Sequence, residues 1–180
     1  MINYDHDYYY NLLKIHSGSA EKICNLRWKF IKENLEPGDN LINALDYGCG
    51  IGFMKAFAPD WLEQVDTYDI MPVIQTGQRC NRYSLVTLCD VLEHIPDFTE
   101  ILPVLNNTTY VFVTVPMKPA KLAWDKYKHF KPGEHLHYFT DDLLTHIFKV
   151  MGFRKIAKGT PECPPREHVW SYLFKREEIS

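Results

Sequence analysis

Three aspartates stand where carboxylates can do chemistry, because Asp46, Asp69 and Asp90 each end a short run of apolar and β-branched residues. In a parallel sheet the carboxyl ends of strands share one edge, so we expect these side chains to line one crevice. The glycine-rich stretch YGCGIG, residues 47–52, follows Asp46 and predicts a tight turn into a helix, with N–H groups aimed at a carboxylate-bearing ligand. Asp46 adds a charge that repels pyrophosphate and attracts an ammonium or sulfonium group. Together they indicate an amino-acid-bearing nucleoside.

The second acid has a spacing typical of nucleotide-binding units. Asp69 follows Asp46 by 23 residues, close to the ~20-residue interval at which a carboxylate meets ribose hydroxyls. The alternative is that Asp69 caps the turn before Pro72. The glycine turn upstream favours ribose binding.

A second group of polar side chains is suited to proton transfer. Glu93 and His94 come just after a predicted strand, and His135 and His137 are two residues apart, so they share a side if extended. Histidine is a good general base because its unperturbed pKa lies near neutrality. The alternative is structural: His94 bonds a local carbonyl at a helix start, and the other two belong to an ordinary polar loop.

Strands and helices alternate along the chain, which predicts an α/β fold with a doubly wound, mostly parallel sheet and an antiparallel C-terminal strand. The predicted strands are Leu41–Tyr47, Gln64–Ile70, Tyr83–Cys89, Thr109–Val115, Phe153–Lys158 and His168–Phe174. The predicted helices are Ala20–Leu35, Ile51–Ala58, Asp97–Leu105 and one that starts at Thr140 and ends at Gly152.

Composition narrows the class of protein. The chain has 180 residues, 46% of them hydrophobic, and we expect one domain: a helical lid or cap over residues 1–40 and a core over 41–175. The net charge of -3 argues against a nucleic-acid partner. Five cysteines without CxxC spacing favour a cytoplasmic location and do not suggest a zinc site, and we expect neither a signal peptide nor a membrane span.

Four segments in order resemble the class I S-adenosylmethionine (SAM) methyltransferases: LDYGCGIG (45–52), DVLEHI (90–95), VTVPM (113–117) and EHLHYFTDDLLTHIFKVMGF (134–153). The resemblance covers roughly Arg27 to Phe174. The last segment is similar to the subgroup that includes small-molecule and sugar O-methyltransferases. The resemblance implies a Rossmann-like fold, SAM as cofactor and transfer of a methyl group to a small molecule or sugar.

The stretch CNLRWKFI, 24–31, further resembles the N-terminal helix of ubiquinone-pathway O-methyltransferases, whose arginine meets the SAM carboxylate. This carries over to Arg27 alone, and the alternative is a solvated arginine on an amphipathic helix. With it, the expected cofactor residues are Arg27, Asp46, Gly48, Cys49, Gly50, Asp69, Ile70 and Cys89. We expect Glu93, His94, His135 and His137 to act in catalysis without a metal. The alternative is a divalent metal on Asp90, Glu93 and His94, since an acid-x-x-Glu-His run supplies ligands in the same relatives.

The chain departs from this family after Asp69. A short segment, residues 70–82, stands where the family has a helix, a third strand and a second helix, so the third-strand region is predicted to be shortened or missing. The acid that meets adenine in the family has no match, which leaves apolar contacts such as Ile70. The alternative function is therefore a SAM-binding module that has lost turnover and acts with a partner, and a homodimer would cover the exposed edge. A NAD-dependent oxidoreductase is disfavoured because GCGIG lacks the GxGxxG spacing.

Overall fold

The computed structural model describes the backbone of residues 6–70 and 82–177, with side chains described from residue 18 onward in those ranges. Six strands form one sheet in the order β2-β1-β3-β4-β6-β5. They are β1 (Asn43–Tyr47), β2 (Gln64–Tyr68), β3 (Leu85–Cys89), β4 (Tyr110–Pro116), β5 (Phe153–Gly159) and β6 (Val169–Arg176). The first four run parallel to their neighbours, whereas β6 is antiparallel to both β4 and β5. The prediction of a doubly wound, mostly parallel sheet with an antiparallel C-terminal strand is confirmed.

The central strand β4 shows why the sheet needs helices on both faces. All seven residues of YVFVTVP are buried, as expected for a strand covered on both sides. Val111, Val113 and Val115 belong to one apolar cluster, whereas Tyr110 and Phe112 belong to a second cluster. Alternate residues of a strand point to opposite faces, so the two clusters are the two cores of the molecule.

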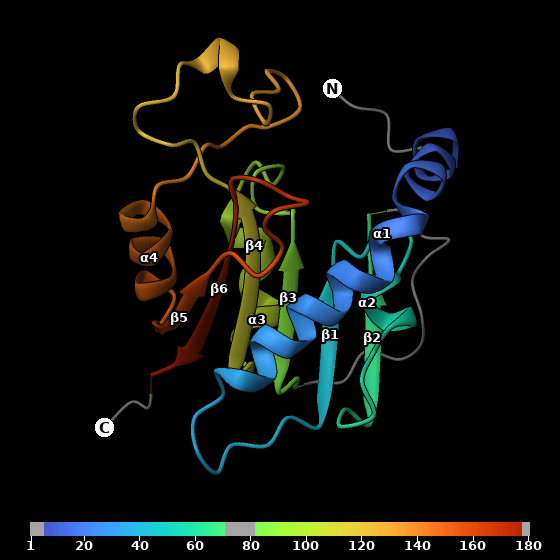
Figure 1. Ribbon diagram of the computed structural model, residues 1–180. Coiled ribbons are helices and arrows are strands. Elements are labelled where there is room, and N and C mark those ends of the chain that lie inside the picture. Colours follow the sequence, from blue (N-terminus) through green and yellow to red (C-terminus); the bar gives the residue numbers. More distant parts are fainter. Residues whose placement is uncertain (1–5, 71–81, 178–180) are drawn as a thin grey trace.

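The helix α1 (His6–Glu33) crosses one face of the sheet diagonally, as Figure 1 shows. Its residues Cys24, Trp28 and Ile31 are buried in the second cluster together with Met54 of α2 (Phe53–Ala56). The opposite face is covered by η2 (Phe98–Ile101), α3 (Leu102–Leu105) and α4 (Asp141–Val150), whose buried residues belong to the first cluster. Between β4 and α4 a long connection, with the short η3 (Trp124–Lys126), extends above the carboxyl ends of the parallel strands (Figure 1).

Helix boundaries differ from the predicted ones in three places. The first helix begins at His6 instead of Ala20. The sequence did not predict this earlier start because Ser17, Gly18 and Ser19 are weak helix formers. The helix after the glycine turn is shortened to Phe53–Ala56. The predicted helix Asp97–Leu105 is a 3₁₀ turn followed by one α-turn, capped by the Asp97 carboxylate on the Thr99 N–H.

The strand β2 forms one edge of the sheet among the described residues. It pairs with β1 through Ala44↔Val65 and Asp46↔Thr67. The predicted loss of the third strand falls on residues 70–82, of which 71–81 lie outside the described residues. Within the described ranges, no strand pairs with the outer side of β2.

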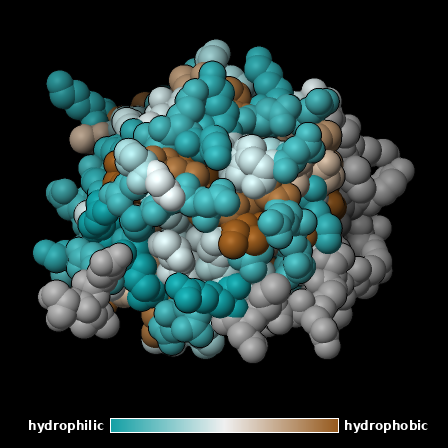
Figure 2. All heavy atoms as spheres, turned by 90° about the horizontal axis from the view of Figure 1, so that it is seen from below, coloured by the Kyte–Doolittle hydropathy of each residue, from teal (hydrophilic) through white to brown (hydrophobic). Residues whose placement is uncertain are grey.

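Seen from the amino ends of the parallel strands, the surface is mostly hydrophilic with small apolar patches (Figure 2). None of the described helices combines the length and the apolar character that crossing a bilayer requires.

Candidate functional site

A crevice of about 500 Å³ opens at the carboxyl ends of β1, β2 and β3, beside α1. It brings together eleven of the side chains or glycines predicted from the sequence: Arg27, Gly48, Cys49, Gly50, Asp69, Ile70, Cys89, Asp90, Glu93, His94 and His135. Two predicted residues, Asp46 and His137, are not part of this lining. Cofactor candidates and proton-transfer candidates therefore share one pocket, as the strand order requires.

The glycine turn after β1 is fixed by steric contact. Gly48 has φ +71°, and a Cβ added to it would lie 2.5 Å from Val91 Cγ2. The turn is bound to β2, because the N–H groups of Gly48 and Cys49 donate to the Tyr68 carbonyl at 2.7 and 3.1 Å. These amides are therefore already paired, contrary to the expectation that the turn aims them at a ligand. The register of β1 and β2 places the Tyr68 carbonyl directly beneath the turn.

Asp69 lies at the mouth of this turn. It is buried, with 4% of its surface exposed, and its Oδ2 accepts a hydrogen bond from the Gly50 N–H at 2.8 Å. The carboxylate thus belongs to the crevice wall while also holding the glycine turn. Asp69 therefore holds the glycine turn and also lies where a carboxylate can accept hydrogen bonds from ribose hydroxyls.

Asp46 lies beneath the crevice on the α1 side of the sheet. Its Oδ1 accepts a hydrogen bond from the Thr87 hydroxyl at 2.7 Å, and only 2% of its surface is exposed. Burial raises the pKa of Asp46 to about 6, although the Thr87 hydroxyl and Arg27 favour its ionised form. Asp46 does not line the crevice, so it can act on a ligand there only through its charge.

Arg27 is buried, which excludes the solvated alternative for this residue. Its Nε donates to Glu162 Oε1 at 2.8 Å, and its Nη2 lies 3.0 Å from Asp90 Oδ2. Arg166 Nη1 bonds the same Asp90 oxygen and Glu162 Oε2, each at 2.8 Å. Burial alone would raise the pKa of Asp90, but Arg166 and Arg27 hold it well below its usual range. Asp90 is thus an ionised partner of two arginines.

Glu93, His94 and His135 form a compact cluster that also lines the crevice. One donor atom from each lies within 4.8 Å of the other two. Glu93 Oε2 and His135 Nδ1 are buried and have no hydrogen-bond partner among the described residues. Buried polar atoms are rarely left in this way, so both atoms indicate a bound ligand or water.

The protonation states of this cluster follow from burial. Burial, with the Asp90 charge added, raises the pKa of Glu93 to about 8. Burial lowers the pKa of His94, and it lowers that of His135 to about 4 with His94 adding to the effect. The His94 Nδ1 lies 3.1 Å from the Glu134 carbonyl, which can only accept, so Nδ1 carries the proton and Nε2 carries the lone pair. Near neutral pH the cluster holds a protonated carboxyl group and two neutral imidazoles.

His137 lies apart from the cluster of Glu93, His94 and His135. Its Nε2 is 2.9 Å from the Ile95 carbonyl, and its backbone N–H donates to the Glu93 carbonyl at 3.3 Å. The strand-like alternation that would place it beside His135 is broken where the Leu136 N–H also turns to the Glu93 carbonyl, at 2.7 Å. His137 thus holds the Glu93 segment against the long connection.

Sequence reasoning missed Glu162 and Arg166, which lie in the loop between β5 and β6. Glu162 is 135 residues from its partner Arg27, so no local pattern links the two. The available signal was a glutamate and an arginine four apart within a proline-rich turn.

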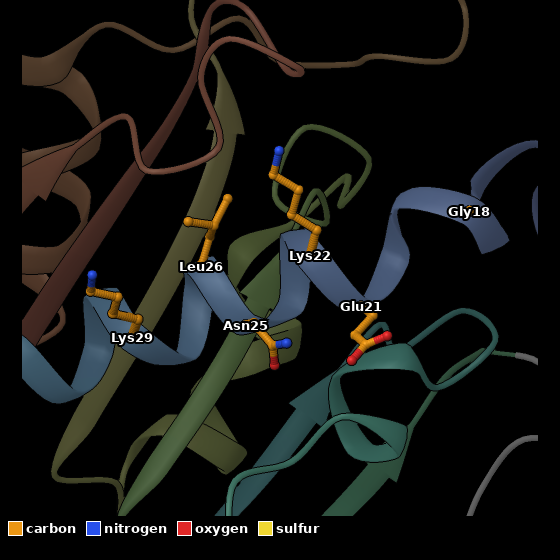
Figure 3. A pocket seen from close by; sticks show the side chains of 6 residues that line it. All are labelled: Gly18, Glu21, Lys22, Asn25, Leu26 and Lys29. Carbon is orange, nitrogen blue, oxygen red and sulfur yellow. The ribbon is translucent and has the colours of Figure 1, made fainter.

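A second hollow lies on the outer side of α1. Figure 3 shows that all six residues lining it come from this one helix, residues 18–29. They present a mixture of charged and apolar side chains along the helix. Among the residues whose side chains the structure describes, none from another element lines this hollow, so we regard it as a surface of α1 and not as part of the site.

A methyltransferase-domain family model matches residues 18–158. The chain belongs to this methyltransferase family. The match contains the glycine turn, Asp69 and the Glu93–His94–His135 cluster, so the site residues predicted from the sequence lie within it. No curated protein sequence matches the chain closely enough to count as a relative.

Three solved structures show how widely this methyltransferase fold is used. The small RNA methyltransferase HEN1 is 17% identical with a TM-score of 0.61, over 89% of this chain and 26% of HEN1. The mitomycin 7-O-methyltransferase MmcR is 12% identical with a TM-score of 0.64, over 94% of this chain and 56% of MmcR. The magnesium protoporphyrin IX methyltransferase ChlM from Synechocystis PCC 6803, with bound SAM, is 16% identical with a TM-score of 0.56, over 90% and 80%. This chain thus spans about a quarter of HEN1 and just over half of MmcR.

Proposed function

We propose that this methyltransferase transfers the methyl group of SAM to a hydroxyl oxygen of a small molecule or sugar. The observation that carries the proposal is the shared crevice: the glycine turn, Asp69 and the Glu93–His94–His135 cluster all line it. A pocket that binds a methyl donor beside proton-accepting groups suits transfer to a group that must lose a proton.

The methyl donor is SAM, held across the carboxyl ends of β1 to β3. Asp69 accepts ribose hydroxyls, while Gly48 and Gly50 let the nucleoside approach the main chain. Arg27 faces the amino-acid end. The remaining walls are Cys49, Ile70 and Cys89, with Asp46 beneath them. The fold's neighbours include ChlM with bound SAM, which supports this placement.

Methyl transfer is an in-line displacement at a sulfonium carbon, so the protein chiefly aligns the two reactants. The acceptor hydroxyl approaches the cluster, and His94 Nε2 accepts its proton, because burial keeps this imidazole neutral at pH 7. Glu93 and His135 orient the hydroxyl through Oε2 and Nδ1, the two atoms without partners among the described residues. His137 holds the backbone of Glu93 in place.

The cluster also fits a divalent metal, which is the alternative to proton transfer by His94 alone. Two imidazoles and a carboxylate with donor atoms within 4.8 Å of one another suit such an ion. The predicted ligand Asp90 does not fit, because its Oδ2 is bound to Arg27 and Arg166, and His135 takes its place. A bound ion would lower the pKa of the acceptor hydroxyl.

The test combines binding and turnover. His94→Ala should leave the affinity for S-adenosylhomocysteine (SAH), measured by calorimetry, within twofold of the wild type. It should lower turnover on the best acceptor by about 10² or more, as expected for loss of a general base. His146→Ala, an exposed histidine on α4, is the matched control and should change neither quantity. Equal turnover of His94→Ala and wild type would remove His94 from the mechanism.

The acceptor panel should contain phenols, sugars, small amines and a short RNA, each assayed with and without a chelator. Transfer to a hydroxyl supports the proposal, and loss of turnover with the chelator favours the metal alternative. Transfer to RNA or to an amine alone would contradict the acceptor class. Tight SAH binding without transfer to any acceptor would favour the alternative of a SAM-binding module that acts with a partner.

A further inference from the structure

The loop between β5 and β6 places two charged side chains against the crevice. Glu162 is fully buried, and Arg166 keeps 25% of its side chain exposed and lines the crevice. The loop is curled on itself, because the Cys163 N–H donates to the Thr160 carbonyl and the Arg166 N–H donates to the Glu162 carbonyl. Its end is bonded to the residue after β4, because the Met117 N–H donates to the His168 carbonyl at 2.8 Å. These bonds fix the backbone from which the Glu162 and Arg166 side chains extend.

The four charges form one closed network. Arg27 binds Glu162 through Nε and Nη2, at 2.8 and 3.2 Å, a two-point contact that fixes the plane of the guanidinium. Arg166 Nη1 bridges Glu162 Oε2 and Asp90 Oδ2, and Arg27 Nη2 binds that same Asp90 oxygen at 3.0 Å. Two arginines and two carboxylates balance, so the network has no net charge. Each buried charge has a partner, as burial requires.

Only part of this network faces the crevice. Arg27, Asp90 and Arg166 line it, whereas Glu162 does not and stands behind Arg27. The crevice thus presents the guanidinium groups of Arg27 and Arg166 next to the Asp90 carboxylate, so both signs of charge are held in fixed places. The amino-acid end of SAM carries the complementary pair, an α-carboxylate and an α-ammonium group. A receptor with both signs in fixed places binds a zwitterion and gains little from the neutral nucleoside.

We propose that Glu162 and Arg166 are positioning residues for the methyl donor: they hold Arg27 and Asp90 as a receptor for the zwitterionic amino-acid end of SAM. The inference rests on the proposed place of the cofactor in the crevice. Glu162 fixes the plane of the Arg27 guanidinium group through two hydrogen bonds. Arg166 gives the Asp90 carboxylate a second hydrogen-bond donor besides Arg27, which fixes its position. The β5–β6 loop is thereby part of the cofactor site, although it lies at the far end of the sequence from α1.

The test compares two ligands that differ at one end. SAH carries the amino-acid end, whereas 5′-methylthioadenosine has the same nucleoside and thioether without it. For Glu162→Gln, calorimetry should show SAH affinity reduced at least tenfold and 5′-methylthioadenosine affinity within twofold of wild type. Glu167→Gln, an exposed glutamate in the same loop whose carboxylate pairs with Lys128, is the matched control and should leave both affinities unchanged.

A second variant keeps the test valid if Glu162→Gln misfolds, because Glu162→Gln leaves the buried Arg27 without its full set of charged partners. Arg166→Gln removes a partly exposed side chain and should reduce SAH affinity by threefold to tenfold without changing 5′-methylthioadenosine affinity. Equal losses for both ligands in the folded variants would show a merely structural role and overturn the inference. Unchanged SAH affinity in Arg166→Gln would also overturn it. If wild-type protein binds neither ligand, the proposed cofactor site fails first, which separates the two hypotheses.

Discussion

Asp46 is a carboxyl group held out of water between two parallel strands, with the Thr87 hydroxyl as its hydrogen-bond donor. Burial raises its pKa to about 6. Between pH 4 and pH 6 the folded chain therefore keeps a proton that the unfolded chain has lost. Stability linked to this proton is complete at low pH and is lost as the pH rises through 6. Asp46 thus costs stability at neutral pH, which is typical of a group retained for its charge in a site.

Asp46→Asn should remove this pH dependence. Relative to wild type, the variant's free energy of unfolding should rise by about 2 kcal/mol between pH 4.5 and pH 7.5, since each unit of pKa shift corresponds to about 1.4 kcal/mol. Urea unfolding at the two pH values measures this difference. Asp60→Asn, at an exposed position, is the control and should show no such trend. A pH-independent difference for Asp46→Asn would contradict a raised pKa.

Asp69 is predicted to bind ribose hydroxyls while it holds the Gly50 N–H. Asp69→Ala removes both contacts and should weaken SAH binding by about 1–3 kcal/mol, the range expected for hydrogen bonds to a charged group. Asp142→Ala, exposed on α4, should leave affinity unchanged. Calorimetry with 5′-methylthioadenosine should show the same loss for Asp69→Ala, because that ligand keeps the ribose. Wild-type affinity in this variant would place the nucleoside elsewhere.

At the scale of elements, the turn after β1 and the segment after β3 fit against each other. A side chain at Gly48 would meet Val91, whereas one at Gly52 would meet nothing within 4 Å, although both glycines have positive φ. A side chain at Gly48 would therefore carry both a backbone cost and a steric cost against the segment after β3. A side chain at Gly52 would carry the backbone cost alone.

Gly52→Ala should cost about 1–2 kcal/mol of unfolding free energy for its left-handed backbone. Gly48→Ala should cost about 1–3 kcal/mol more, because the new methyl group overlaps Val91. Combining Gly48→Ala with Val91→Ala should recover part of that excess, and a double-mutant cycle from urea unfolding measures the coupling. Equal costs at the two glycines, or no coupling to Val91, would contradict the close approach.

The sequence predicted elements well where packing is continuous and less well where helices are short. Runs such as Tyr110–Pro116 are buried on both faces, so their apolar pattern reveals a strand. The stretch Asp97–Leu105 divides into a 3₁₀ turn and a single α-turn, with Pro103 in the first turn of α3. Helices this short are marginal in isolation, so tertiary contacts also decide their form. The start of α1 was missed for a local reason, the weak helix formers around Gly18.

At the scale of the whole molecule, the crevice is assembled from segments far apart in the chain. α1, the turn after β1, the end of β2, the segment after β3 and the β5–β6 loop all contribute. Asp69 and Asp90 were predictable as crevice residues because strand ends share one edge of the sheet, whereas Asp46, predicted by the same rule, is not part of the lining. Glu162 was not, because its contact with Arg27 spans 135 residues and depends on how the antiparallel strands turn. The pairing of the Gly48 and Cys49 N–H groups with β2 depends likewise on strand register.

This assembly predicts where ligand binding slows backbone hydrogen exchange. SAH at 100 times its dissociation constant stabilises the folded state by about 2.7 kcal/mol, so exchange through openings that break the site should slow by up to about 100-fold. We expect this protection in residues 20–27, 47–51, 89–95 and 160–168, which contribute to the crevice or its charge network. Helix α4 packs on the opposite face of the sheet, so its local fraying should be unaffected. In Glu162→Gln, protection of residues 160–168 should fall more than that of the other segments, because this variant weakens the bonds between the loop and Arg27 and leaves only Arg166 at the crevice. Protection confined to α4, or its absence from α1, would contradict the crevice as the site of SAM binding.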